Sequence, residues 1–461
     1  VLGAGEAADS LLRELNRSGL WYAVALVDEG VNKAGRRLRG LPVFGPLAKV
    51  SEVAEKYGAK HVVMALPDAK PAIRRRATEL ATAAGLTVMT MPSYDDLLAG
   101  RLSVSHIRRV ELEDLLGREA ISLNTAGLHE LMTNRVVLVS GAGGSIGAEL
   151  CRQIALFSPL RLVLLDSSEF ALYQVNEELS VKFPGLVRSC WAADIRDQAR
   201  VEEILVAEQP AVIFHAAAYK HVPLMEDVNA WQAVRTNALG TLTLAEAALH
   251  AKVDKFVLIS TDKAVNPTNV MGASKRLAER LCRVIQLGGK TRFVTVRFGN
   301  VLGSNGSVIP KFREQILRGG PLTVTHPDIV RYFMTIPEAA QLVLQAGFMG
   351  QGGEIFVLDM GEPVKIVDLA KDMIRLSGFS EDDIRIEFTG LRPGEKLYEE
   401  LLANDETTVQ TPHPKLRIAK LSDSMSTAEF DELLHWLRPS VRQADDVKAG
   451  LKHFVPEYST N

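Results

Sequence analysis

Acid–base chemistry is indicated by a short polar run, Ser260-Thr261-Asp262-Lys263, that follows the apolar residues 256–259. Adjacent carboxyl and amine groups can serve as general acid and general base when the carboxyl is protonated and the amine is neutral. A free lysine has a pKa of about 10.4, so the role of base requires that burial and nearby positive charge lower the pKa of Lys263. The alternative is an ordinary salt bridge at a strand end, and the triplet alone does not decide between the two.

A second candidate group follows at helical spacing. Met271 and Lys275 are four residues apart, which places both side chains on one face of a helix. A methionine cannot take a proton from a hydroxyl. Met271 could therefore equally be part of the apolar core.

A phosphate-binding turn is predicted at residues 141–147, where a glycine-rich run follows an apolar strand and opens a helix. Glycines at 141, 144 and 147 let the backbone approach a pyrophosphate, whose charge the helix N-terminus stabilises. Asp166 ends the next strand, where a carboxylate binds ribose hydroxyls and repels a 2′-phosphate, so NAD is expected rather than NADP. The residues expected around NAD are Gly141, Gly144, Ser145, Ile146, Gly147, Asp166, Ser167, Asp194, Ile195, Ala216, Ala217 and Tyr219.

Two of these expectations have a structural alternative. Asp194 lies just beyond a strand, where it could meet the adenine edge or cap the following helix. The alanines at 216–218 have the small side chains that close passage of a dinucleotide needs, but they could merely pack. Both interpretations can hold together.

The elements that position these residues form two βαβ units of the same design, at residues 1–28 and 136–166. Each has an apolar strand, a glycine turn, a helix and a strand ending in an acid, as at the start of a doubly wound parallel sheet. Further strands are predicted at 189–192, 211–215, 255–260 and 292–297, which completes a six-strand sheet for the second unit. The fold class is therefore α/β, with two Rossmann-like domains.

Three regions are expected along the chain. Residues 1–100 form an N-terminal Rossmann-like domain with strands at 61–66 and 87–91, residues 101–133 an ordered connector, and residues 134–461 the catalytic domain. After residue 299 the irregular pattern predicts a substrate-binding subdomain. The first unit's Gly3, Gly5, Ala8 and Asp28 could hold another nucleotide, although the lack of a downstream catalytic set favours a structural or regulatory role.

Composition excludes several classes of protein. The 461 residues are 47% hydrophobic and 24% charged. With 53 basic against 56 acidic residues and no long basic run, no nucleic-acid partner is expected. The three cysteines, at 151, 190 and 282, match no metal-ligand spacing and indicate a reducing compartment, so no metal is expected. No apolar run reaches the roughly 18 residues needed to span a bilayer.

Lys275 and the methionine four residues before it indicate a resemblance to a known family. Short-chain dehydrogenases have Tyr-x-x-x-Lys where this chain has Met271-Gly272-Ala273-Ser274-Lys275. With the Thr-Asp-Lys triplet, this departure resembles the UDP-N-acetylglucosamine 4,6-dehydratases of bacterial polysaccharide synthesis, especially their long membrane-anchored members. The other matching motifs are residues 141–147, 215–223, 260–263, 297–304 and 391–396.

The resemblance implies an activity and roles for residues. The expected reaction is oxidation at C4 by NAD, loss of water across C5 and C6, and return of the hydride to C6, with retention at C5. Thr261 would bond the 4-hydroxyl, Asp262 would be the acid, Lys263 the base, and Lys275 would bind the nicotinamide ribose. Which group takes the 4-hydroxyl proton stays open. The expected UDP-sugar contacts are Lys220, His221, Asn300, Ser307, Lys311, Arg331, Arg392 and Glu395, of which Arg331 could equally be a surface residue and His221 a satisfied loop histidine.

Two other functions remain: a nucleotide-sugar 4-epimerase, and a non-catalytic nucleotide-sugar sensor. Short-chain dehydrogenases commonly pair through the helices after the fourth and fifth strands, so a homodimer or larger assembly is expected through residues 228–250 and 270–287. The start at Val1, within a strand, suggests a truncated chain. In the family, transmembrane helices precede the first domain, which would place the full-length protein at the cytoplasmic face of the bacterial inner membrane.

Overall fold

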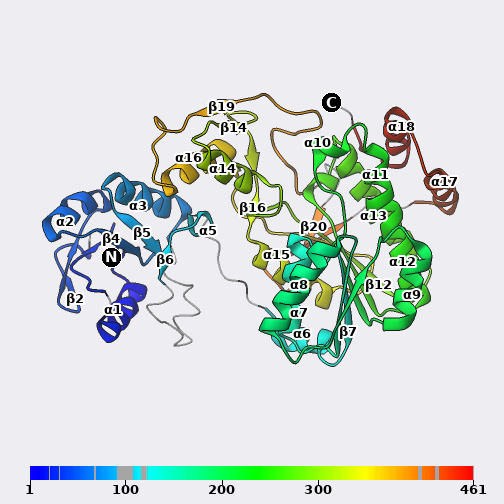
Figure 1. The fold of residues 1–461 in the computed structure, drawn as a ribbon, viewed down its shortest axis with the longest axis horizontal. Coiled ribbons are helices and arrows are strands. Elements are labelled where there is room, and N and C mark those ends of the chain that lie inside the picture. Colours follow the sequence, from blue (N-terminus) through cyan, green and yellow to red (C-terminus); the bar gives the residue numbers. More distant parts are fainter. Residues whose placement is uncertain are drawn as a thin grey trace. The chain divides into compact units, whose positions relative to one another are not determined.

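The computed structural model describes residues 1–19, 21–30, 32–66, 69–90, 107–115, 121, 123–402, 407–420 and 425–459. The chain divides into two compact units (Figure 1). Unit 1 comprises Val1–Ala120, Phe312–Val324 and Val367–Glu387, and unit 2 comprises Ile121–Lys311, Thr325–Ile366 and Phe388–Asn461. The two later segments of unit 1, which the sequence placed in the catalytic domain, thus cluster with the N-terminal residues.

Unit 1 is built on a mainly parallel sheet in which Leu2 bridges to Val27 on one side and to Met64 on the other. The strands are β1 (Leu26–Val27), β2 (Arg37–Leu38), β3 (Leu41–Phe44), β4 (His61–Met64), β5 (Thr87–Thr90) and β6 (Arg108–Arg109). The helices include α1 (Glu6–Ser18), α2 (Val50–Tyr57), α3 (Pro71–Ala83) and α5 (Leu112–Leu115). In the later segments, Asp372 of α16 (Ile366–Leu376) forms an ion pair with Arg75 of α3 at 2.9 Å.

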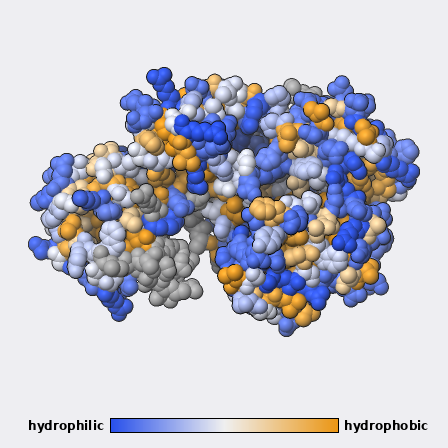
Figure 2. Space-filling model, viewed as in Figure 1, coloured by the Kyte–Doolittle hydropathy of each residue, from blue (hydrophilic) through white to orange (hydrophobic). Residues whose placement is uncertain are grey.

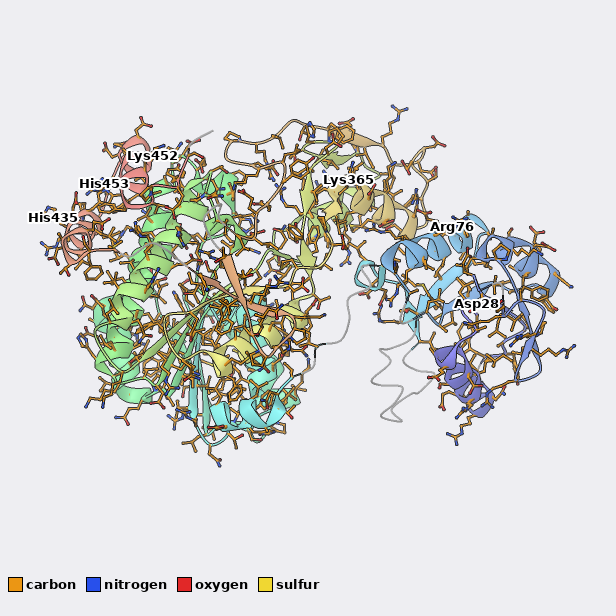
Figure 3. All side chains as sticks on the ribbon, turned by 180° about the vertical axis from the view of Figure 1, so that it is seen from behind. Asp28, Arg76, Lys365, His435, Lys452 and His453 are labelled. Atoms are coloured by element: carbon orange, nitrogen blue, oxygen red, sulfur yellow. The ribbon has the colours of Figure 1, made fainter. Side chains whose placement is uncertain are left out.

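The first glycine turn has the backbone geometry of a Rossmann turn. Gly3 has a φ of +100°, and a Cβ there would lie 2.4 Å from the carbonyl oxygen of Ala65. Asp28 accepts hydrogen bonds from the backbone N–H groups of Ala4 at 2.6 Å and Gly30 at 2.7 Å, and Lys33 lies 3.1 Å away (Figure 3). The carboxylate that would bind a ribose in this unit is therefore paired with a lysine of the protein.

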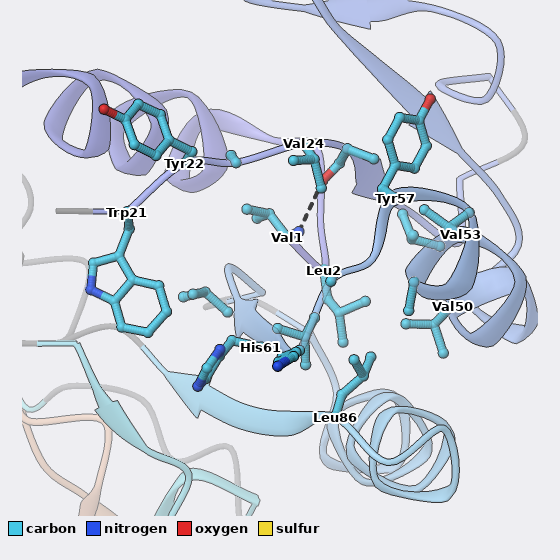
Figure 4. Close-up of a pocket in the computed structure, with 18 of the residues that line it drawn as sticks. Val1, Leu2, Trp21, Tyr22, Val24, Val50, Val53, Tyr57, His61 and Leu86 are labelled. Atoms are coloured by element: carbon cyan, nitrogen blue, oxygen red, sulfur yellow. Dashed lines mark hydrogen bonds between the residues drawn. The ribbon is translucent and has the colours of Figure 1, made fainter. Parts of the chain in front are cut away.

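A cavity of about 300 Å³ in unit 1 lies at the amino-terminal ends of the strands (Figure 4). Its wall includes Val1, Trp21 and His61. The rings of Trp21 and His61 pack edge to face, with their centroids 4.9 Å apart. The backbone nitrogen of Val1 donates to the carbonyl of Ala25 at 3.0 Å. Ligands of doubly wound sheets bind at the opposite, carboxyl ends of the strands, so this cavity is not where a dinucleotide would lie.

Unit 2 is a three-layer sandwich around a nine-stranded sheet. The order is β20 (Thr407–Gln410), β21 (Leu416–Lys420), β17 (Ile355–Leu358), β12 (Arg292–Arg297), β11 (Lys255–Ile259), β10 (Val212–His215), β7 (Val136–Ser140), β8 (Arg161–Asp166) and β9 (Arg188–Ala192). From β9 to β17 all pairs are parallel, and β21 and β20 are antiparallel. The six strands expected from the sequence are present, but β17, β21 and β20 extend the sheet beyond them. The predicted fold class is confirmed.

Helices cover both faces of this sheet and bury a hydrophobic core on each. One face has α6 (Thr125–Met132), α7 (Ser145–Ala155), α8 (Glu169–Lys182) and α15 (Ile336–Met349). The other has α9 (Gln198–Glu208), α11 (Ala230–Val234), a π-helical turn (Arg235–Leu239), α12 (Gly240–His250) and α13 (Val270–Gln286), with α17 (Thr427–Leu437) and α18 (Ala444–Phe454) outside them. On the visible face of unit 2 hydrophobic and hydrophilic residues are interspersed (Figure 2).

The later part of the chain supplies short paired strands instead of a second large sheet. The pairs are β13 (Asn300–Val301) with β16 (Phe333–Met334), β15 (Val330–Arg331) with β18 (Val364–Lys365), and β14 (Leu322–Val324) with β19 (Ile386–Phe388). Two further helices of the chain are α10 (Val222–Met225) and α14 (Val308–Leu317). In the part of the chain that the structure describes, no helix combines the length and apolarity needed to cross a membrane.

Candidate active site

The polar triplet lies at the carboxyl end of β11, the edge of a doubly wound sheet where ligands bind. Backbone N–H groups of Ser260 and Asp262 donate to the carbonyls of Val296 and Phe298, at 2.7 and 3.0 Å. Thr261 then caps a short 3₁₀ turn (Asp262–Ala264) through the N–H of Lys263. Pairing to the neighbouring strand thus fixes the backbone of the triplet.

The triplet side chains form one cluster around the buried carboxyl group of Asp262. Asp262 Oδ1 accepts from Thr261 Oγ1 at 2.9 Å and from Lys263 Nζ at 3.1 Å. Lys263 Nζ also lies 3.3 Å from both Asn300 Oδ1 and Glu399 Oε1. The other oxygen of Asp262, Oδ2, is buried and has no hydrogen-bond partner among the described residues. An unsatisfied buried oxygen is costly in a core and therefore indicates a group that meets a ligand.

The protonation of this cluster agrees with the sequence-based requirement for Asp262 and contradicts it for Lys263. Burial raises the pKa of Asp262, which favours the neutral acid. Burial would lower the pKa of Lys263, but the carboxylates of Asp262 and Glu399 outweigh it and raise that pKa. The expected fall in the Lys263 pKa is therefore not found in this structure: the carboxylate of Asp262 opposes it most, and Glu399, which was not foreseen as a neighbour, adds to that effect.

Helix α13 approaches the triplet closely. A Cβ on Gly272 would lie 2.1 Å from the carbonyl oxygen of Lys263, so only glycine lets the helix pass here. Asn269 caps the helix by accepting from the N–H of Gly272 at 2.8 Å. Lys275 donates to the carbonyl of Ile259 at 2.6 Å, and burial lowers its pKa to about 8. Met271 is 3% exposed and belongs to the apolar core, which was one of the two interpretations of this residue.

A buried ionic network on α13 and β12 contacts Ser260, the residue before the triplet. Glu279 on α13 accepts from Ser260 Oγ at 2.6 Å and from Arg297 Nε and Nη2 at 2.8 and 2.7 Å. Arg276 reaches the same carboxylate at 3.3 Å. The side chains of Glu279 and Arg297 are each 1% exposed. Sequence reasoning missed Glu279, although its spacing of four from Lys275 is the helical signal that could have found it.

The second glycine turn fits a dinucleotide. Gly141 has a φ of +68°, and a Cβ there would lie 2.5 Å from the backbone nitrogen of Ala217. At Gly147 a Cβ would lie 2.0 Å from the carbonyl oxygen of Gly141, so the third glycine is needed for the helix to start here. No side chain caps the N-terminus of α7. Asp166 accepts from the N–H of Gly143 at 2.9 Å and of Ser168 at 2.9 Å, which turns the carboxylate to the edge of the turn.

Other residues expected around the cofactor have structural partners. Asp194 binds Arg196, whose Nε lies 2.9 Å from both carboxylate oxygens, and the cap of α9 is Asp197 instead. Ile195 packs in the core. The backbone of Tyr219 exchanges hydrogen bonds with the side chain of Asn237 in the π-helical turn, at 2.8 and 3.0 Å. Asn237 therefore fixes the loop that follows Ala216 and Ala217.

Arg331 has several partners within the protein. Its guanidinium donates to the carbonyls of Val330, Lys396 and Leu397. It also lies 3.3 Å from Glu399 and 3.6 Å from Glu395. Arg331 is 8% exposed, so it is not a surface residue, and its hydrogen bonds anchor the loop that follows Gly394.

The remaining candidate substrate contacts lie in several separate segments of unit 2. Lys220 donates to Ser304 Oγ at 3.2 Å, and burial lowers its pKa. The ring of His221 lies against Gly306, where a Cβ would be 2.4 Å from Cε1. Ser307 Oγ is buried without a partner among the described residues, and Lys311 is exposed. The guanidinium of Arg392 lies 3.0 Å from the carboxylate of Glu395. Burial would raise the pKa of Glu395, but the hydrogen bonds from Arg392 outweigh burial and lower that pKa.

The sequence and the fold are similar to those of known proteins. A family model described as polysaccharide biosynthesis protein matches residues 137–421. The chain belongs to this family. The chain is 47% identical over 432 residues to the capsular polysaccharide biosynthesis protein CapD of Staphylococcus aureus, covering 93% of this chain and 72% of CapD. It is 44% identical over 426 residues to the probable polysaccharide biosynthesis protein EpsC of Bacillus subtilis, covering 92% of this chain and 71% of EpsC.

A solved structure extends the comparison. The X-ray structure of Pen from Bacillus thuringiensis matches with a TM-score of 0.58 and 33% identity, and covers 66% of this chain and 99% of Pen. The resemblance inferred from the sequence motifs is therefore confirmed at the level of the polysaccharide biosynthesis protein family.

Sequence reasoning also missed Glu399, which lies 3.3 Å from the amine of Lys263. The motif at 391–396 continues through Leu397-Tyr398-Glu399, three residues past the point at which it was interpreted. The side chain of Glu399 is 5% exposed. Arg331 anchors the loop that carries Glu399 beside Lys263. No local sequence pattern indicates this contact, because it joins segments that are far apart along the chain.

Proposed function

We propose that this polysaccharide biosynthesis protein is a nucleotide-sugar-modifying enzyme that catalyses NAD-dependent 4,6-dehydration of UDP-N-acetylglucosamine, with the configuration at C5 retained. The observation that supports this most is the buried Thr261–Asp262–Lys263 cluster with Lys275 on the adjacent helix and no tyrosine at 271. Simple oxidation and reduction at C4 need no second acid–base pair, whereas loss of water does.

The residues divide the chemistry between them. Bound NAD would supply the oxidation at C4 and the later reduction at C6. Thr261 would bind the 4-hydroxyl, and Lys263 Nζ would take the C5 proton that the C4 ketone makes acidic. The buried Oδ2 of Asp262 would hold the proton that the 6-hydroxyl needs in order to leave as water. A proton would return to C5 as the hydride reaches C6, and the proton released from the 4-hydroxyl would balance the one that Asp262 gives up. The elements of one water are thus lost, and the oxidation state of the sugar as a whole is unchanged.

Lys263 must lose its proton before it can act as base. Its ammonium is stabilised by Asp262 and Glu399, whereas Arg331 favours the neutral amine. A protonated Asp262 leaves Glu399 as the main counter-charge, and the positive nicotinamide of bound NAD would oppose it. We propose that the loaded site, rather than the empty one, supplies the neutral amine.

Incubation of the purified protein with UDP-N-acetylglucosamine and no added NAD tests the proposed function. We expect steady formation of a product that is lighter by one water, because the cofactor ends each cycle as it began. A product of unchanged mass with inverted C4 would instead establish a 4-epimerase. Tight binding with no product, also after NAD is added, would establish a sensor.

Cofactor preference gives a prediction for Asp166. Asp166→Ala should weaken NAD binding and improve tolerance of NADP, because the carboxylate next to Gly143 no longer binds the ribose or repels a 2′-phosphate. Titration of both dinucleotides measures the two affinities. Asp197→Ala, which removes only the cap of α9, is the matched control. Unchanged affinities in Asp166→Ala would place the ribose elsewhere.

The pH profile gives a prediction for Glu399. Glu399→Gln removes a negative charge 3.3 Å from Lys263 Nζ that raises the pKa values of both Lys263 and Asp262. Loss of that charge lowers both values, so both limbs of the kcat profile should move to lower pH, by on the order of one unit. Glu399→Asp should restore the profile, and Glu400→Gln, next to Lys396, is the control. An unmoved profile would show that Glu399 does not act on the pair.

A further inference from the structure

The outer face of α11 and α13 is covered by the chain itself. Every residue of α13 from Val270 to Cys282 is buried, although a helix on one side of a sheet normally exposes one face. The cover is the segment 425–459 with its two helices α17 and α18, here called the C-terminal clasp, and α18 packs on both α11 and α13 (Figure 1). The clasp lies beyond residue 421, where the match to the family model ends.

Aromatic contacts join the clasp to α11. Trp231 of α11 meets Trp436 edge to face at 5.2 Å and donates from Nε1 to the carbonyl of Pro439 at 3.2 Å. Trp436 also contacts Phe454 at 5.4 Å, and the guanidinium of Arg442 lies over both tryptophans at 5.5 and 5.4 Å. The apolar residues of the clasp thus continue the core of unit 2, and those fully or almost fully buried are Leu433, Leu437, Val447, Leu451, Phe454, Val455 and Tyr458.

Charges on the two surfaces are complementary. Arg276 of α13 lies 2.8 Å from Glu457, and Arg280 lies 3.8 Å from Glu429 and donates to the carbonyl of Phe454. Lys448 of the clasp lies 3.2 Å from Asp227, before α11. By contrast, His435, Lys452 and His453 lie on the solvent side of α17 and α18 (Figure 3). The clasp therefore has one side built for α11 and α13 and another built for water.

We propose that the C-terminal clasp takes the place of a second subunit on the α11–α13 face, so that two copies of this enzyme do not pair through it. The helices 228–250 and 270–287, through which pairing was expected, include this face. In such a pair the α13 helices of two copies would bury each other's apolar side chains, and here Leu451, Phe454 and Tyr458 already do so. Any homo-oligomer then forms through a different surface. The inference is independent of the reaction catalysed.

Locking the clasp tests the proposal in the intact chain. Arg276→Cys and Glu457→Cys, in a Cys190→Ser background, place two thiols where an ion pair now lies, and a short bismaleimide can bridge them. We expect a bridge within one chain and sedimentation identical to that of the unbridged protein at every concentration. A bridge between two chains, or an oligomer that locking abolishes, would overturn the proposal.

Loosening the clasp tests it in the opposite direction. Trp436→Ala with Phe454→Ala removes the aromatic contacts, and Val441→Ala, at a clasp residue that is 74% exposed, is the matched control. We expect the double variant, and not the control, to gain a dimer whose fraction rises with concentration. A folded double variant with unchanged sedimentation would count against the proposal. If the double variant fails to fold, the locked chain alone decides.

Discussion

Lys263→Ala should abolish proton removal at C5 and lower turnover by roughly 10²–10⁴-fold, the usual contribution of a positioned base. The amine lies within 3.3 Å of Asp262, Asn300 and Glu399, and none of these can reach over to replace it, because each is held by its own partners. Incorporation of solvent deuterium at C5, followed by mass spectrometry, measures the lost step directly.

Two controls make this result specific. NAD binding should be unchanged in Lys263→Ala, because Lys275 and the glycine turn remain. Asp262→Asn should behave differently: exchange at C5 persists while loss of water is blocked, since an amide cannot deliver the proton that the 6-hydroxyl needs. Product formation at the wild-type rate by Lys263→Ala would remove this lysine from the mechanism.

Glu279→Gln should cost about 3–5 kcal/mol of folding free energy, the usual penalty for removing one partner of a buried ion pair. Arg297, with a side chain that is 1% exposed, would keep its charge without the bidentate carboxylate, and Ser260 would lose its acceptor. Chemical denaturation followed by circular dichroism measures the change, with the denaturant slope compared between variants.

Glu457→Gln is the matched control for Glu279→Gln. Glu457 binds the same Arg276 but is 24% exposed, so its loss should cost about 0–1 kcal/mol. Because Glu279 orients Ser260 next to the triplet, a stable Glu279→Gln variant should also lose turnover. Stabilities of the two variants within experimental error of one another would show that the buried network contributes little.

The fold could be predicted because it follows from local patterns. Apolar strands, glycine turns and terminal acids recur at fixed spacing in both units, and backbone sterics leave few structures for that order. The strands β17, β21 and β20 were missed because their addition to the sheet, in that order beyond β12, is decided by packing of distant segments. For the same reason nothing local marked 312–324 and 367–387 as belonging with unit 1.

By itself the sequence determined the α/β class, the glycine turn and the Thr261-Asp262-Lys263 run, since each is encoded by neighbouring residues. Only the tertiary structure decided what surrounds that run. Glu399, brought in by the Arg331-anchored loop, adds to Asp262 in raising the pKa of Lys263, because electrostatic energy depends on distance in space and not along the chain. The C-terminal clasp likewise covered a face that the family pattern assigned to a partner, because an apolar helix face is buried by whichever matching surface is tethered closest.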